Sequence, residues 1–136
     1  MIVLDASVIA KWFVEEPKSS SALYYRDLHL KKKDMIIAPD IIIYELANFF
    51  RYRKDFTEKE ITSVIEALEN FGLRIIDLNF KEMAKAAIFA RHNYITVYDA
   101  SYVITAINFR CKFITADEKL YEKIKDLGFI ELLQAQ

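Results

Sequence analysis

Four acidic residues occur at positions where a carboxylate could take part in chemistry. Asp5 and Asp117 each directly follow a short apolar run, Asp99 stands at the start of a largely apolar segment, and Glu45 interrupts another apolar segment. An ionised carboxylate inside an apolar helix is costly unless a group of opposite charge lies beside it. Glu45 therefore predicts a bound cation or a nearby lysine or arginine.

Hydroxyl residues accompany two of these acids. Asp5-Ala6-Ser7 and Thr115-Ala116-Asp117 each place a hydroxyl two residues from an acid, on the same side of an extended segment. Asn48 lies one helical turn after Glu45, on the same helix face. Carboxylate and hydroxyl oxygens are hard ligands that suit Mg²⁺ or Mn²⁺ better than zinc. We therefore expect one or two divalent ions at a site made of Asp5, Glu45, Asp99 and Asp117, supported by Ser7, Asn48 and Thr115.

Helix capping is an alternative explanation for three of the four acids. Asp5, Asp99 and Asp117 each stand where a helix could begin, and aspartate is a preferred N-cap residue. Capping accounts neither for Glu45 nor for the hydroxyls at fixed spacing. Four carboxylates in one pocket would raise each other's pKa, and divalent ions would remove that repulsion.

Strands and helices alternate along the chain and would position the acids. Short apolar runs predict buried strands at residues 2–4, 35–38, 73–78, 112–116 and 129–132. Helical spacing predicts helices at residues 8–13, 21–30, 40–54, 57–71, 81–93, 99–109 and 117–127. Pro39 and Asp40 are expected to open the third helix. The alternation predicts an α/β fold, a three-layer α/β/α sandwich with a central parallel sheet of four to five strands.

This fold would bring the acids together. In open parallel sheets, the ligand crevice lies outside the carboxyl ends of the strands. Asp5 and Asp117 follow strands directly, while Glu45 and Asp99 lie near the beginnings of helices. All four can therefore converge on one edge of the sheet.

Composition limits the classes of function. A chain of 136 residues predicts one domain over residues 1–136. Its two glycines exclude Gly-rich phosphate loops and dinucleotide fingerprints. The formal net charge of -1 provides no general attraction to nucleic acid. A single cysteine excludes an internal disulfide, and no apolar run is long enough for a membrane span, so we expect a cytoplasmic protein.

The segments that carry these residues resemble the PIN-domain ribonucleases, and most of all the VapC toxins of toxin–antitoxin pairs. The segments are Met1–Ser7, Glu45–Asn48, Val97–Tyr102 and Phe113–Leu120, and the resemblance extends over the whole chain. It implies a PIN-like fold and an Mg²⁺- or Mn²⁺-dependent endoribonuclease that hydrolyses RNA phosphodiester bonds. The acidic metal and catalytic site would then consist of Asp5, Glu45, Asp99 and Asp117.

Protein partners are expected from apolar residues beyond what a small core needs. The predicted helix over Ile41–Phe50 is apolar on nearly every side, which predicts a homodimer, as the resemblance also implies. A small VapB-like antitoxin is expected to lay an apolar segment into a groove between the early helices. The aromatic residues that suggest this groove are Trp12, Phe13, Tyr24, Tyr25, Phe49 and Tyr52.

Three other functions are considered. A PIN-domain nuclease of RNA processing would have the same site but no antitoxin. A non-catalytic interaction module of the same fold would use its acids only as helix caps and would bind neither Mn²⁺ nor Mg²⁺. A phosphatase of the haloacid dehalogenase type needs a second aspartate two residues after the first, where this chain has Ser7.

Overall fold

A five-stranded parallel sheet forms the centre of the molecule. The computed structural model describes residues 1–134, and its strands are β1 (Ile2–Leu4), β2 (Ile36–Pro39), β3 (Arg74–Ile76), β4 (Lys112–Thr115) and β5 (Ile130–Leu132). They lie in the order β3-β2-β1-β4-β5, and every neighbouring pair is parallel. The predicted strand positions and the parallel sheet are confirmed, with strand ends shifted by at most two residues.

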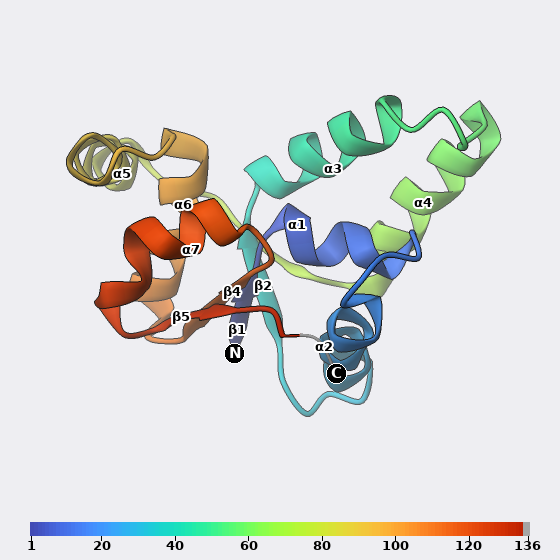
Figure 1. Cartoon of the computed structure of the whole chain (residues 1–136), viewed down its shortest axis with the longest axis horizontal. Helices are drawn as coiled ribbons and strands as arrows, with labels where there is room; N and C mark the ends of the chain where they lie inside the picture. The colour runs from blue at the N-terminus through green and yellow to red at the C-terminus, as the bar shows by residue number, and fades with distance from the viewer. Residues whose placement is uncertain (135–136) are drawn as a thin grey trace.

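Helices cover both faces of this sheet. They are α1 (Ala6–Ile9), continued by η1 (Ala10–Trp12), α2 (Ser19–Leu30), α3 (Ile41–Arg51), α4 (Glu58–Phe71), α5 (Phe80–Asn93), α6 (Val97–Phe109) and α7 (Glu118–Ile124), continued by η2 (Lys125–Leu127). In Figure 1, α5, α6 and α7 lie to the left of the sheet, and α1 to α4 lie to its right. This arrangement is the expected three-layer α/β/α sandwich, with right-handed crossovers. None of the described helices is long and apolar enough to span a membrane.

Several helix boundaries differ from the prediction by one to three residues, and two of these differences have a clear local cause. Pro39 pairs with Ile76 as the last residue of β2, so α3 begins at Ile41 and not at the proline. Proline is tolerated there because a strand end does not require its missing N–H. Helix α6 begins at Val97, two residues earlier than expected, because the Thr96 hydroxyl accepts a hydrogen bond from the Asp99 N–H and caps the helix.

The apolar faces meet in one main core and one smaller cluster. Val3, Leu4 and Phe113 at the centre of the sheet have no exposed surface. Helix α6 covers this part of the sheet, and its residues 100–106 are all buried. On its other side α6 packs against α5 through small residues, and this cluster consists of Ala86, Ala90, Ala100 and Ile104. The core of the α5–α6 pair is therefore separate from the main core.

Helix α3 and the aromatic residues are covered more completely than expected. Ile42, Leu46 and Phe50 repeat every four residues on α3 and are buried within the chain, whereas Tyr44 is 72% exposed. Trp12 is buried too, and its Nε1–H donates to the Ala22 carbonyl at 2.9 Å. The apolar surface left for partners on α3 is thus restricted to one side, because helical periodicity directs the other side to the core.

A buried histidine connects α2, β2 and the end of α4. The Nδ1 atom of His29 accepts a hydrogen bond from the Ile36 N–H at 3.1 Å, so Nε2 carries the proton and donates to the Phe71 carbonyl at 2.7 Å. His29 is only 8% exposed. Both ring nitrogens of His29 are therefore used in hydrogen bonds that connect these elements.

The first prediction concerns this histidine. His29→Ala leaves the Ile36 N–H and the Phe71 carbonyl without their partner, and we expect the free energy of unfolding to fall by about 3 kcal/mol. His92→Ala, at an exposed position near the end of α5, is the control and should change it by less than about 0.5 kcal/mol. Urea unfolding followed by circular dichroism measures both changes. Equal midpoints for the two variants would show that His29 does not connect these elements.

Candidate active site at the carboxyl edge of the sheet

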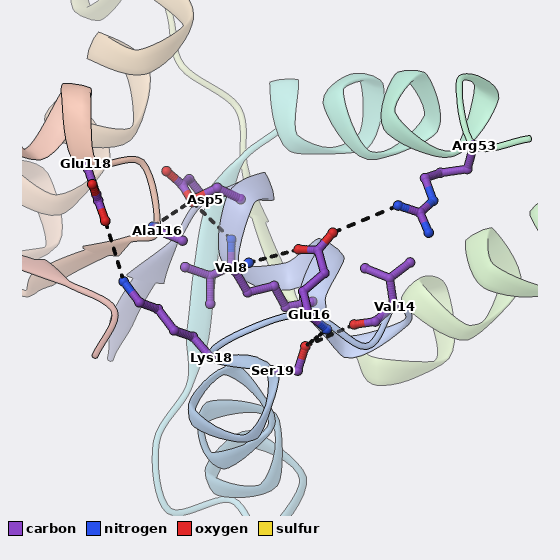
Figure 2. Close-up of polar contacts among 11 residues, drawn as sticks. Asp5, Val8, Val14, Glu16, Lys18, Ser19, Arg53, Ala116 and Glu118 are labelled. Atoms are coloured by element: carbon purple, nitrogen blue, oxygen red, sulfur yellow. Dashed lines mark hydrogen bonds and ion pairs between the residues drawn. The ribbon is translucent and has the colours of Figure 1, made fainter. Parts of the chain in front are cut away.

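The carboxylate of Asp5 lies at the carboxyl end of β1, beside the end of β4. The chain leaves β1 toward β2 and leaves β4 toward β5, in opposite directions, so a crevice opens between the two strands. Asp5 is 5% exposed. Its Oδ1 accepts from the Ser7 hydroxyl at 2.5 Å and from the Val8 N–H at 3.3 Å, and its Oδ2 accepts from the Thr115 hydroxyl at 2.5 Å. Figure 2 shows Asp5 above the first turn of α1, with Val8 and Ala116 beside it.

The two hydroxyls can donate to Asp5 because the backbone occupies their acceptor sites. The Ser7 oxygen accepts from the Ala116 N–H at 2.9 Å, and the Thr115 oxygen accepts from the Asp117 N–H at 3.1 Å. Each hydroxyl has one proton, which is then directed to the carboxylate. The hydroxyls two residues from an acid, noted in the sequence, therefore hold Asp5 from two elements, Ser7 from α1 and Thr115 from the end of β4.

Asp117 and Asp99 face the same open pocket from different elements. Asp117 caps α7 by accepting from the Leu120 N–H at 3.0 Å. Asp99 lies in the first turn of α6, where Thr96 is the cap. The pocket has a volume of about 380 Å³, and both aspartates line it. Asp5 and Asp117 therefore do cap helices, as the alternative explanation expected, whereas Asp99 does not.

Glu45 reaches the same edge from α3 and is held by a tyrosine. The hydroxyl of Tyr102 donates to Glu45 Oε1 at 2.5 Å. Tyr102 is 1% exposed, and its ring stacks on Phe113 with the centroids 5.6 Å apart. No role for Tyr102 was predicted from the sequence. The available signal was a tyrosine in the middle of an apolar helix, because a buried phenol hydroxyl needs a partner.

Burial and mutual repulsion disfavour the charged forms of these acids. Burial raises the pKa of Asp5 to about 7, although the hydrogen bonds from Ser7 and Thr115 oppose that shift. Burial also raises the pKa of Glu45 and of Asp99. The charge of Asp99 adds to the upward shift in the pKa of Asp5 and of Glu45, and that of Asp117 adds to the shift of Asp99. Asp99 is thus electrostatically coupled to the other three acids.

The acids fit a divalent cation in donor type and in charge. Within residues 1–134, none of the four forms an ion pair with a lysine or arginine. The ion pairs drawn in Figure 2 join other residues, such as Lys18 with Glu118. In the same part of the chain, no three acidic, histidine or cysteine side chains are already arranged to hold a metal ion. The edge of the sheet therefore has hard oxygen donors that form no ion pair with a lysine or arginine among the described residues. Asn48 on α3 is exposed.

The second prediction follows from the raised pKa of Asp5. The pKa of the Asp5 carboxyl is 3.8 in the unfolded chain and about 7 in the folded protein. Its contribution to the free energy of unfolding is therefore fully present below pH 3.8 and is lost as the pH rises to about 7. In metal-free buffer, Asp5→Asn should therefore gain stability relative to the parent as the pH rises from about 5 to about 7. The relative gain is at most about 1.4 kcal/mol per pH unit.

Thermal and urea unfolding of the two proteins across this pH range measures that difference. Asp55→Asn is the control: a hydrogen bond from Arg53 lowers the pKa of Asp55, so this carboxyl is ionised in both the folded and the unfolded protein across this range. Its stability difference from the parent should therefore not change between about pH 5 and about pH 7. The parent gaining stability over Asp5→Asn as the pH rises would contradict the prediction.

Comparison with known proteins agrees with this architecture. The family model described as PIN domain matches residues 2–126. Ribonuclease VapC3 of Pyrobaculum aerophilum is 30% identical over 130 residues, which cover 93% of this chain and 96% of that protein.

Two solved structures share the fold at low sequence identity. VapC20 of Mycobacterium tuberculosis, described as a sarcin-ricin loop cleaving toxin, has a TM-score of 0.71 at 14% identity, covering 98% of this chain and 100% of that one. VapBC2 of Rickettsia felis, bound to promoter DNA, has a TM-score of 0.68 at 18% identity, covering 97% of each chain. Together with the family model, the parallel sheet and the acids at its edge, these similarities show that the chain belongs to the PIN domain family.

Proposed function

We propose that this protein is a divalent-metal-dependent endoribonuclease and the toxin of a toxin–antitoxin pair. The observation that carries the proposal is the Asp5 carboxylate, which is buried without a cation and held by two hydroxyls among three other acids. A relative that is 30% identical over nearly the whole chain is named a ribonuclease, which supports the same reaction. One or two Mg²⁺ or Mn²⁺ ions, held by Asp5, Glu45, Asp99 and Asp117, would offset the repulsion among these acids.

The roles of the protein groups follow from their contacts. A bound divalent ion would supply Lewis acidity and activate water for attack on the phosphodiester bond. Ser7 and Thr115 fix the orientation of the Asp5 carboxylate by donating to one oxygen each. Tyr102 holds Glu45 in place on the opposite side of the site. Within this assignment, no histidine and no covalent nucleophile is required.

The third prediction is that neutralising any of the four acids removes RNA cleavage but leaves a folded protein. The variants are Asp5→Asn, Glu45→Gln, Asp99→Asn and Asp117→Asn. Each should lose more Mn²⁺-dependent activity than the roughly 10–100-fold typical of groups that only orient a metal ligand. Their unfolding midpoints in metal-free buffer should equal or exceed that of the parent, because repulsion is removed.

Two further variants make this a graded test. Tyr102→Phe keeps the stack on Phe113 but loses the hydrogen bond to Glu45, and we expect roughly tenfold weaker Mn²⁺ binding by calorimetry. Glu66→Gln, on the exposed side of α4, should cleave RNA and bind Mn²⁺ like the parent. Full activity in two or more of the acid variants would refute the four-acid site. Parent-like Mn²⁺ binding in Tyr102→Phe would refute only the positioning role.

The proposed antitoxin would bind an apolar groove between α3 and α4. The groove has a volume of about 400 Å³, and its lining is apolar except for Glu69. The apolar lining residues are Ile42, Ile43, Leu46, Ile65, Leu68, Leu73 and Ile75. Solved relatives that include complexes named VapBC2 and FitAB support a protein partner. An apolar helix or strand in this groove would lie on the helix that carries Glu45, and a lysine or arginine of the partner could extend from it into the acidic site.

A homodimer would use a different surface. One face of α5 consists of exposed residues, among them Phe80 at 97% and Ile88 at 59% exposure. Two alanines at intervening helical positions, Ala84 and Ala87, are also exposed and would let a second helix approach closely. We propose this face as the dimer contact, in place of the side of α3 that the chain itself covers.

The fourth prediction is that antitoxin and metal compete. If a cationic side chain of the antitoxin enters the acidic site, Mn²⁺ should weaken antitoxin binding by the same factor by which antitoxin weakens Mn²⁺ binding. Calorimetry of the product of the neighbouring gene, with and without Mn²⁺, measures both factors. Binding indifferent to Mn²⁺ keeps the partner but excludes occlusion of the site, and absence of binding favours an RNA-processing nuclease without antitoxin.

Two surface variants separate the proposed interfaces. Ile43→Asp places a charge in the α3–α4 groove and should weaken antitoxin binding without changing the mass by sedimentation. Ile88→Asp places the same charge on α5 and should produce monomers that still bind antitoxin. If Ile43→Asp instead produced monomers and Ile88→Asp weakened antitoxin binding, the dimer contact would lie in the α3–α4 groove and the antitoxin would bind α5.

A further inference from the structure

The pocket that contains Asp99 and Asp117 also presents groups that an acidic metal site does not need. Its lining includes a turn between α5 and α6, which contributes Tyr94 and Thr96, and one side of α7, which contributes Lys119 and Lys123. The volume of about 380 Å³ lies within the range of small-ligand sites. Half of the acids of the proposed active site thus share an open pocket with an aromatic ring and two ammonium groups.

Tyr94 presents its ring to solvent from a fixed backbone. The residue ends α5 in the left-handed conformation with φ of 56°, and it is 83% exposed. Glycine or asparagine would suit this conformation better, and neither the core nor the cap requires an aromatic side chain here. The Nζ atom of Lys123 donates to the Tyr94 carbonyl at 2.8 Å and so connects the turn to α7. The ring therefore lines the pocket from a backbone position that is held by its contact with α7.

Lys119 and Lys123 lie one turn apart on the same side of α7. Lys123 uses one of its three N–H donors on Tyr94, which leaves two for a ligand. Within residues 1–134, Lys119 forms no ion pair and no side-chain hydrogen bond. A substrate phosphate approaching four acids would be repelled, and the net charge of -1 on the chain does not offset this repulsion. Two lysines beside the site reduce the repulsion where the substrate must lie.

We propose that this pocket is a subsite for one nucleotide of single-stranded RNA, adjacent to the phosphodiester bond that is cut. The Tyr94 ring stacks on the base, and Lys119 and Lys123 contact the flanking phosphates. Stacking on an exposed aromatic ring is the usual way in which unpaired RNA bases are bound, and it accepts any base. This inference rests on the proposed ribonuclease function, because it names how the substrate of that same site is held.

The chemistry of the pocket favours RNA over a protein partner. Lysines are depleted in the centres of protein interfaces, whereas they are common phosphate contacts. The apolar α3–α4 groove, whose lining does not include Tyr94, and the face of α5 formed by Phe80, Ala84, Ala87 and Ile88 provide surfaces suited to proteins. Binding of a protein at Tyr94 is one of the outcomes that the following experiment distinguishes.

The test uses the whole protein and an unstructured, fluorescein-labelled 12-nucleotide RNA of mixed sequence as the probe. Tyr94→Asn removes the ring but suits the positive φ, Tyr94→Phe keeps the ring, and Tyr24→Asn removes a tyrosine that is 53% exposed on α2. In metal-free buffer, fluorescence anisotropy should give a dissociation constant roughly tenfold higher for Tyr94→Asn, whereas the other two variants match the parent. Lys119→Ala should weaken binding and lower the slope of log K against log salt by about 1.

Measurements with Mn²⁺ separate substrate binding from damage to the site. Tyr94→Asn should raise KM for RNA cleavage roughly tenfold, keep kcat within about twofold, and bind Mn²⁺ in calorimetry like the parent. A Tyr94→Asn variant that binds the RNA as tightly as the parent overturns the subsite. Loss of the dimer by sedimentation, or of antitoxin binding, with RNA binding retained assigns Tyr94 to a protein contact and also overturns it.

The measurements distinguish a wrong subsite from a wrong proposed function. If the parent protein neither binds nor cleaves RNA while Mn²⁺ still binds, both the ribonuclease function and the subsite are rejected. If the parent binds and cleaves RNA and only the Tyr94 and Lys119 variants show no effect, the function stands and the subsite alone is rejected.

Discussion

The buried carboxylate of Asp5 is the constraint on which the arrangement of this protein depends. A carboxylate at a strand end that is 5% exposed would be strongly destabilising without donors. The chain supplies two hydroxyls, from Ser7 and Thr115, and directs their protons by occupying their lone pairs with backbone N–H groups. These contacts join β1, β4 and the starts of α1 and α7. The central strands therefore cannot shift in register without leaving this charge unsatisfied.

The remaining acids are held at this edge by elements from both faces of the sheet. Asp99 is carried by α6 and couples electrostatically to each of the others, whereas Glu45 arrives from α3 on the opposite face. The hydrogen bond from Tyr102 is the direct link between these two helices at the site. Because Tyr102 is fixed by its stack on Phe113, the position of Glu45 depends on the core packing of the sheet. Geometry at the site is thus set by the interior and not by surface loops.

Surfaces of different chemistry surround the acidic edge and lie on different elements. The groove between α3 and α4 is apolar, one face of α5 is apolar and flat, and the pocket beside α7 combines an aromatic ring with two lysines. An apolar groove suits an amphipathic segment, an apolar helix face suits a second helix, and aromatic and cationic groups suit an unpaired nucleotide. Each surface can therefore be altered by a substitution that leaves the other two intact.

By itself, the sequence determined the alternation of strands and helices, the parallel sheet and the location of the acids at strand and helix ends. Local periodicity encodes these features, and the spacing of two residues assigned Ser7 and Thr115 to the neighbourhood of the acids. That Thr115 donates to Asp5, 110 residues away in sequence, was decided by the tertiary structure. The tertiary structure alone decided that Tyr102 holds Glu45, 57 residues away in sequence, and that Trp12 belongs to the interior. It also decided that Thr96, not Asp99, caps α6, and that Tyr94 stands beside two lysines of α7. Residue spacing specifies which side of an element a group occupies, but not which distant element packs against that side.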